Sequence, residues 1–376
     1  MGKSAGASIT TGGSNTCIGR EAGVAVTTAD GNTLVGTTCG DAITTGASNT
    51  AMGHEAMSTC STGHVAIGRY ALQDLETAAN NTAVGYNAGK DITTGANNIA
   101  ISQSLGTCTT GAGNIAMGVN TAGSLTTGTN NVMIGLAAAG SVTTGANNVF
   151  IGTDTGDATT TAASNVGVGG NTTGASNVAV GRLALVSNTT ASNNVAIGYN
   201  TAYAVTTAGQ ITAVGSYAGD AITTGANNTV VGHYAGSSLT TGAQSVAIGS
   251  YALQDATDPV NSVCVGHDAG KDITTGDSNT YIGQGTGTAT TTGHSNVAIG
   301  NVAGDVVTTG ANNVSIGINT DPSANNGNQQ LAIGYGAIGK GDNTAFVSSN
   351  GGAVYAGNNS ADFSTTSDRR IKKNIV

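Results

Sequence analysis

One unit of 17 residues, close to T-T-G-A-N-N-V-A-I-G-x-x-A-G-x-x-I, recurs along this chain and restricts its fold more than any other feature. Indexed by the glycine that follows its Ile or Val, here called the column glycine, the unit occurs 20 times. Of the 19 spacings between these positions, 16 are 17 residues. The exceptions are Gly53 to Gly68 with 15 residues, Ser102 to Gly118 with 16, and Gly169 to Gly181 with 12. A fixed short period predicts a repeat architecture in which stacked units share one core.

The apolar pattern inside the unit predicts a short β-strand. The residue before the column glycine is Ile or Val in 18 of 20 units, and the residue two positions earlier is Val, Ile, Leu or Thr. The residue between them is usually Ala, as in Val195-Ala196-Ile197. This alternation is typical of a strand with one buried face. We expect the Ile and Val columns to supply the interior.

Two further columns predict turns and a second strand. Asn stands four residues before the column glycine in 15 of 20 units, as at Asn148. Asn tolerates left-handed backbone and belongs at turns, and amides stacked in register also form hydrogen-bonded ladders. A Thr-Thr pair such as Thr223-Thr224 follows an apolar position and predicts a second strand, with Gly225 at the corner.

Two strands and two tight turns per unit make one coil of a parallel β-solenoid, so the expected fold is all-β with about 20 coils. Seventeen residues are too few for a βαβ unit or a propeller blade. We expect a leader at 1–8, the solenoid at 9–334, a segment outside the repeat at 335–367, and the start of another domain at 368–376.

Composition excludes several partners. The net charge of −9 repels phosphate, so no nucleic acid is expected. No run approaches the ~18 apolar residues of a membrane span, so no membrane insertion is expected. Five cysteines without a CxxC pair indicate neither a disulfide framework nor a zinc site, and we expect no metal and no cofactor. An apolar secretory segment is not visible at the start, which favours assembly in a reducing cytoplasm.

Stripes of small residues suggest more than one chain. The residue three after the column glycine is mostly Ala, as at Ala22, Ala88, Ala218 and Ala303. We expect a second chain to pack on these stripes in a rotationally symmetric homotrimer, either intertwined or side by side. The alternative is that they are the interiors of tight coils.

The pattern Asn-x-Val-Ala-Ile-Gly, seen around Asn194 to Thr201 and Asn296 to Ala303, resembles the head repeat of trimeric autotransporter adhesins of the YadA type. The resemblance covers about residues 9–334. It implies a left-handed parallel β-roll with three chains around one axis. The unit of that family is shorter, and the Thr-Thr-Gly segment accounts for the difference.

The last residues carry a second resemblance. Ser367-Asp368-Arg369-Arg370-Ile371-Lys372-Lys373-Asn374-Ile375 is similar to the opening of the intramolecular chaperone domain that ends many phage tail fibres and tailspikes. The resemblance implies that Ser367 is the nucleophile and scissile residue of an autocleavage junction. Asp368 would begin the chaperone, and cleavage would require the rest of that domain. The alternative is a basic, solvated tail.

Two columns hold candidate binding side chains. Tyr217, Tyr234 and Tyr251 occupy one column in three successive coils, where a tyrosine ladder could stack on a sugar ring, although plain surface packing is the alternative. His54, His233 and His267 share the preceding column. They could bind an anion or a metal, but Arg and Tyr in the same column favour a variable rim. The irregular coils near 53–68 and 169–181 are further places where a binding surface is expected.

We therefore predict a structural and attachment protein rather than an enzyme: a trimeric fibre shaft or receptor-binding tail fibre of a bacteriophage. Its place would be the virion, after assembly in the host cytoplasm. Its partners would be two further copies, other tail proteins, and a glycan or protein receptor on the host surface. The alternatives are a trimeric autotransporter-like adhesin on a bacterial surface and an ice-binding solenoid that uses its threonine rows.

Overall fold

The computed structural model describes residues 2–59, 62–157, 159–170, 173–349, 352–357 and 364–365. The chain divides into two compact units, Met1–Val180 and Gly181–Val376, here called unit 1 and unit 2. Each unit is a parallel β-solenoid, as the 17-residue period predicts. The described residues form no helix, and so none that could cross a membrane.

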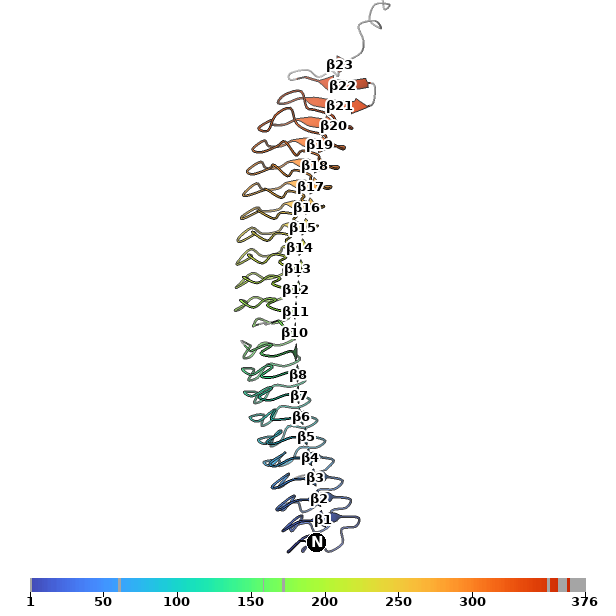
Figure 1. Ribbon diagram of the computed structural model, residues 1–376, viewed down its shortest axis with the longest axis vertical. Coiled ribbons are helices and arrows are strands. Elements are labelled where there is room, and N and C mark those ends of the chain that lie inside the picture. The colour runs from blue at the N-terminus through green and yellow to red at the C-terminus, as the bar shows by residue number, and fades with distance from the viewer. Residues whose placement is uncertain are drawn as a thin grey trace, which may run out of the picture. The chain divides into compact units, whose positions relative to one another are not determined.

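In unit 1, each three-residue strand pairs in parallel with the strand of the next coil (Figure 1). Residues one repeat apart face each other, as Cys17 and Leu34 do. The strands are β1 (Thr16–Ile18), β2 (Thr33–Val35), β3 (Thr50–Met52), β4 (Val65–Ile67), β5 (Thr82–Val84), β6 (Ile99–Ile101), β7 (Ile115–Met117), β8 (Val132–Ile134), β9 (Val149–Ile151), β10 (Val166–Val168) and β11 (Val178–Val180).

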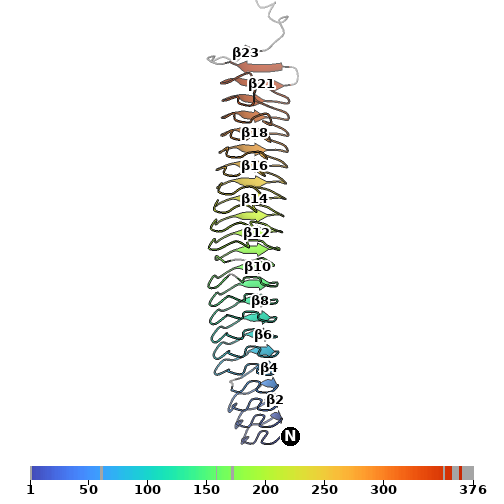
Figure 2. The ribbon, with the colours of Figure 1, turned by 60° about the vertical axis from the view of Figure 1, so that its left-hand side comes forward.

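Unit 2 repeats this arrangement and ends differently (Figure 2). Its strands are β12 (Val195–Ile197), β13 (Thr212–Val214), β14 (Thr229–Val231), β15 (Val246–Ile248), β16 (Val263–Val265), β17 (Thr280–Ile282), β18 (Val297–Ile299), β19 (Val314–Ile316), β20 (Leu331–Ile333), β21 (Ala345–Ser349), β22 (Gly352–Ala356) and β23 (Ser364–Thr365). Parallel pairing continues past the last regular unit to β21, after which β22 and β23 pair antiparallel.

Each regular coil contains one strand, so the predicted second strand at the Thr-Thr pair is wrong. The chain bends there instead. Thr126 and Thr127 both donate their backbone N–H to the carbonyl of Thr143, at 2.9 and 3.4 Å. Successive N–H groups of a strand point in opposite directions, so two that converge on one carbonyl belong to a turn.

The middle residue of each strand points inward, which corrects the expected interior. Ala196 and Ala298 are buried, whereas Ile197 and Ile299 beside them are 40% and 38% exposed. The alanine stripe that includes Ala22 is also fully buried inside its own coil. The prediction that a second chain packs on the alanine stripes is therefore wrong, and the alternative of tight coil interiors is confirmed.

Side chains on the opposite wall explain why small residues face inward. Seven residues after the column glycine, Ile43, Ile92, Val142, Ile222 and Ile273 are fully buried. These branched side chains already fill the narrow interior. In coils such as that of Ile222, close packing leaves room for only a small residue, here Ala213, from the strand across from it.

The interior balances large and small residues within each coil. Where the middle strand residue is large, the fourth residue after the column glycine is small: it is Gly in the pairs Phe150 with Gly156 and Tyr281 with Gly287, and Ala139 in the coil of Met133. A Cβ added at Gly156 would lie 2.8 Å from the ring of Phe150. Where the middle residue is Ala, the same position accepts a large side chain, and Leu72 in the coil of Ala66 is an example.

The predicted amide ladder forms along one edge of the coils. Asn131 Oδ1 accepts hydrogen bonds from the backbone N and the side-chain Nδ2 of Asn148, both at 3.0 Å. Asn131 Nδ2 also donates to the carbonyl of Gly145 at 2.9 Å. The left-handed backbone expected at this column lies instead one residue earlier, for example at Asn147 with φ of 59°.

The column glycine is required by the stacking distance. Gly215 has φ of 131°, and a Cβ there would lie 2.6 Å from the carbonyl oxygen of Gly232 in the next coil. A side chain on this backbone would push neighbouring coils apart and break the adjoining ladder; Ser102, the one other residue in the column, has a φ of 69° instead. The same close approach recurs at most of the 19 column glycines, which make up about a third of the 60 glycines.

Candidate functional site

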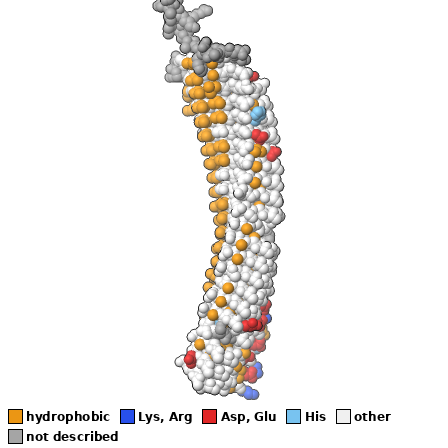
Figure 3. All heavy atoms as spheres, turned by 180° about the vertical axis from the view of Figure 1, so that it is seen from behind, with side chains coloured by type: hydrophobic (Ala, Val, Ile, Leu, Met, Phe, Trp, Pro, Cys, Tyr) orange, Lys and Arg blue, Asp and Glu red, His pale blue; other side chains and the backbone are white. Residues whose placement is uncertain are grey.

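The clearest candidate site is an exposed apolar stripe on the outer face of the sheet. We define the apolar stripe as the residues immediately before the column glycine, together with those two positions earlier. Neither column contains a charged residue. Figure 3 shows the stripe in orange within each unit.

The stripe residues are half-buried or exposed in both units. In unit 1 the most exposed large members are Ile18, Met52, Ile67, Met117, Ile151 and Val168, at 36–51%. In unit 2 they are Ile197, Ile248, Ile282, Ile299 and Ile316, at 36–40%. Single exposed apolar residues are common on protein surfaces, but a contiguous row marks an interaction site.

The three predicted tyrosines do form a ladder in unit 2. The rings of Tyr217 and Tyr234 stack at 4.7 Å with a 3° interplanar angle, and those of Tyr234 and Tyr251 at 5.9 Å and 9°. At one end of the ladder Tyr199 packs edge-on against Tyr217, with an interplanar angle of 81°. At the other end His267 packs edge-on against Tyr251, with an interplanar angle of 76°. Since the ring faces are turned toward aromatic neighbours, this geometry favours surface packing. Stacking on a sugar stays a prediction.

The three tyrosines have an energetically unfavourable left-handed backbone conformation. Tyr217, Tyr234 and Tyr251 have φ between 55° and 60°. Left-handed backbone costs a residue with a side chain roughly 1–2 kcal/mol. Partial desolvation, followed by the nearby Tyr199, raises the pKa of Tyr217.

The histidine column lies at an exposed rim. His267 Nδ1 is 2.7 Å from a carboxylate oxygen of Asp268, and His54 Nε2 is 3.5 Å from one of Glu55. His233 packs edge-on against Tyr234 and Tyr251. Each ring thus contacts its own neighbours within one or two coils.

Among the residues that the structure describes, the other titratable groups form no cluster that resembles a metal site. Within the described ranges, no three His, Cys, Asp or Glu side chains gather as a metal site would require. Burial raises the pKa of Cys39 to about 12 and of Cys108 to about 11, so these thiols stay protonated. Burial, and then the neighbouring carboxylate of Asp305, raises the pKa of Asp321 to about 6.

The threonine rows are partly used within the fold. The first hydroxyl of each pair donates to a carbonyl of the next coil, as Thr223 Oγ1 does to Thr240 at 3.2 Å. In most pairs the second threonine is exposed and the first is half-buried, as Thr224 and Thr223 are. An ice-binding surface would therefore have one threonine row at this corner instead of two.

The predicted autocleavage junction, Ser367 and Asp368, lies outside the described residues. No profile of a known protein family and no curated protein matches the chain.

Proposed function

We propose that this chain is a structural and attachment protein that self-associates through its apolar stripe into a parallel homotrimeric fibre. The exposed row of Ile and Val on the outer sheet face is the observation that carries this proposal. The resemblance of the last residues to a tail-fibre chaperone junction supports a place in a bacteriophage tail, with a receptor on the host surface as the further partner.

The repeat of the stripe favours a second copy as its occupant. A partner that covers the stripe needs an apolar surface with the same strand spacing of about 4.8 Å, and this chain has such a surface. A three-fold axis parallel to the solenoid axis would bring stripe residues of the same coil together. Equivalent coils of the three chains then lie at the same height along the axis, so the contact between chains repeats once per coil.

The energetics suit association over many coils. Full burial of an Ile or Val side chain contributes about 1.5–3 kcal/mol, so covering the exposed part of the stripe contributes roughly 1 kcal/mol per coil. Association costs about 4–15 kcal/mol in lost translational and rotational freedom. A few coils therefore cannot hold chains together, whereas a whole unit can.

Charged substitutions in the stripe test the proposal. We expect Ile248→Lys, Ile282→Lys and Ile299→Lys, combined in one chain, to abolish the assembly measured by sedimentation velocity. The side chains already point outward, so the coil interior should remain intact. Thermal unfolding followed by circular dichroism checks this.

A matched control places the same charge on another exposed column. Thr224→Lys, Thr275→Lys and Thr292→Lys lie on the corner away from the strand and should leave the assembly unchanged. Equal sedimentation of the stripe variant and the wild type would overturn the proposed interface. Loss of assembly in both lysine variants would show that charge, and not the stripe, matters.

A further inference from the structure

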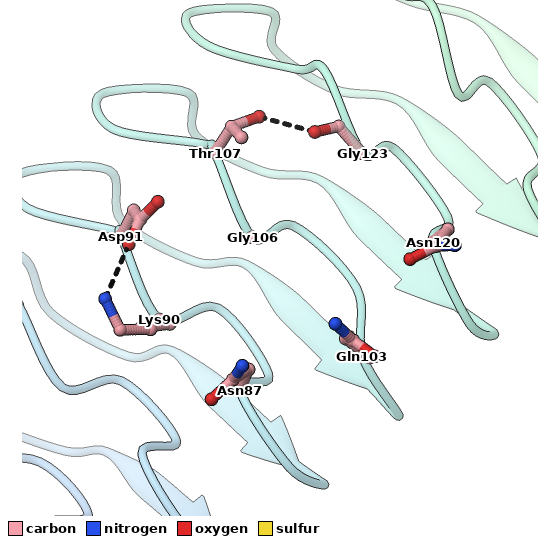
Figure 4. Close-up of a pocket in the computed structure, with 8 residues that line it drawn as sticks. All are labelled: Asn87, Lys90, Asp91, Gln103, Gly106, Thr107, Asn120 and Gly123. Carbon is pink, nitrogen blue, oxygen red and sulfur yellow. Dashed lines mark hydrogen bonds and ion pairs between the residues drawn. The ribbon is translucent and has the colours of Figure 1, made fainter.

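A polar groove of about 440 Å³ opens in unit 1 at the coil that is one residue short (Figure 4). In a regular coil two residues separate the column glycine from the buried small residue. In this coil Gln103 alone lies between Ser102 and the buried Ser104. The 16-residue spacing from Ser102 to Gly118 was the sequence signal for this groove, although the sequence expectations pointed to the other two irregular coils.

Hydrogen bonds identify which residue is missing. Asn120 N donates to Gln103 O at 2.9 Å, a bond that the first residue after the column glycine accepts in regular coils. Gly89 N donates to Ser104 O at 2.9 Å, which places Ser104 in the buried column. The short coil therefore has no counterpart of Asn87 and Asn120, and a notch opens between these two side chains.

Glycines leave the floor of the notch open. Gly106 and Gly123 line the groove in successive coils, at the position that Lys90 occupies one coil earlier. A Cβ added at Gly106 would meet no atom within 4 Å, and the backbone there is not left-handed. The groove thus exists because these positions lack side chains, not because the backbone requires glycine.

The walls present both donors and acceptors. The amides of Asn87, Gln103 and Asn120 form a row along one side of the groove. Lys90 and Asp91 line the groove from the same coil as Asn87 (Figure 4). Lys90 Nζ is 3.2 Å from a carboxylate oxygen of Asp91 and 3.4 Å from one of Asp74. Asn87 Oδ1 is buried and accepts no hydrogen bond, so this amide is not fixed by a donor to its oxygen.

We propose that this groove binds a neutral sugar residue of a surface glycan. The inference rests on the attachment role proposed above and supplies its ligand class. A sugar hydroxyl both donates and accepts, and so does an amide, so a row of amides suits adjacent hydroxyls. The ammonium of Lys90 is already paired with the carboxylates of Asp91 and Asp74, so the groove offers no unpaired positive charge to an acidic sugar. The volume lies within the range of about 300–1,000 Å³ that is typical of small-ligand sites.

Glycan microarray binding by the full chain tests the proposal. The array carries neutral hexose and N-acetylhexosamine oligosaccharides beside sialylated and sulfated ones. We expect wild type to bind neutral glycans and not acidic ones. Gly106→Leu fills the open floor and should weaken binding about tenfold or more, while Gln103→Ala removes one amide and should weaken it about threefold to tenfold.

Ser237→Leu is the matched control, because Ser237 holds the position of Gly106 in a regular coil of unit 2. It should bind like wild type, and all variants should keep the melting temperature of wild type. Absence of neutral-glycan binding by wild type, or unchanged binding by Gly106→Leu, would overturn the proposal. Sedimentation of the same samples separates the two proposals, since a chain that binds glycan without assembling contradicts only the trimer.

Discussion

Phe150 illustrates, at the scale of single residues, how one side chain depends on another in the same coil. Phe150 is fully buried, and Gly156 leaves space for its ring. Phe150→Ala should lower the free energy of unfolding by about 3–5 kcal/mol, because it leaves a cavity. Gly156→Leu alone should also destabilise the fold, since the new side chain meets the ring.

Combining the two substitutions should recover much of the loss. The double variant has Ala at the strand and Leu at the fourth position, the arrangement of Ala66 and Leu72, and Leu72 shares the left-handed backbone of Gly156. A double-mutant cycle by urea unfolding measures the coupling. Additive losses in the double variant would contradict the size balance proposed for the interior.

His64 replaces Asn in the amide ladder, and we expect it to make the stability of unit 1 depend on pH. Its Nε2–H donates to Ala78 O at 2.9 Å, and its Nδ1 accepts from Asn81 N at 3.1 Å, so the ring must be neutral. Burial lowers the pKa of His64 below the usual 6.5. Since the folded pKa is the lower one, the fold loses stability as the pH falls below 6.5 and through the folded pKa.

The expected loss is on the order of 1–3 kcal/mol, the cost of an unsatisfied buried group. Thermal unfolding at pH 7.5 and pH 5 measures it. His64→Asn restores the residue found in the neighbouring coils and should flatten this pH dependence. An equal pH dependence in this variant and in wild type would assign the effect to other groups.

At the scale of the structural element, the amide ladder links each coil to the next. Asn131→Ala leaves the buried N–H of Asn148 and the carbonyl of Gly145 without their partners, and we expect a loss of about 2–4 kcal/mol. Asn131→Ser should cost less. In unit 2, Ser262 takes this place with weaker contacts, accepting from Asn279 N at 3.3 Å. Chemical denaturation compares the two variants, and equal losses would contradict the role of the amide.

The repeat period predicted the coil and the ladder because both depend on spacing. It could not show which face of a three-residue strand is buried, since Ile, Ala and Val are all apolar. That choice depends on the opposite wall, where Ile222 and its equivalents fill the interior. The Thr-Thr pair was misjudged because β-branched composition favours strands, whereas the converging N–H groups of Thr126 and Thr127 are a three-dimensional property.

For the candidate sites, too, some features follow from the sequence and others only from the structure. The column that holds Tyr217 could be predicted, because a fixed period aligns residues, but the mutual stacking of the rings required coordinates. The outward direction of the stripe could not be predicted, because a three-residue apolar strand does not show which of its faces is buried. The groove beside Gln103 follows from a missing residue, and only the hydrogen bonds of Asn120 and Gly89 show which residue that is.

At the scale of the whole molecule, the same repetition that stabilises the coils creates a problem of register. Shifting one chain along another by one unit preserves nearly every contact, so an assembly of such chains needs a terminal device to align them. The three irregular spacings inside the repeat and the residues after Gly334 break the period, so a shifted alignment would mismatch these positions.

The mass of the wild-type chain in solution tests the central claim most directly. Multi-angle light scattering coupled to size-exclusion chromatography gives this mass without any assumption about shape. Burial of the apolar stripe between copies predicts three times the 36.2 kDa chain mass, unchanged on dilution. A stable mass of 36.2 kDa, with the stripe exposed to water, would contradict the account.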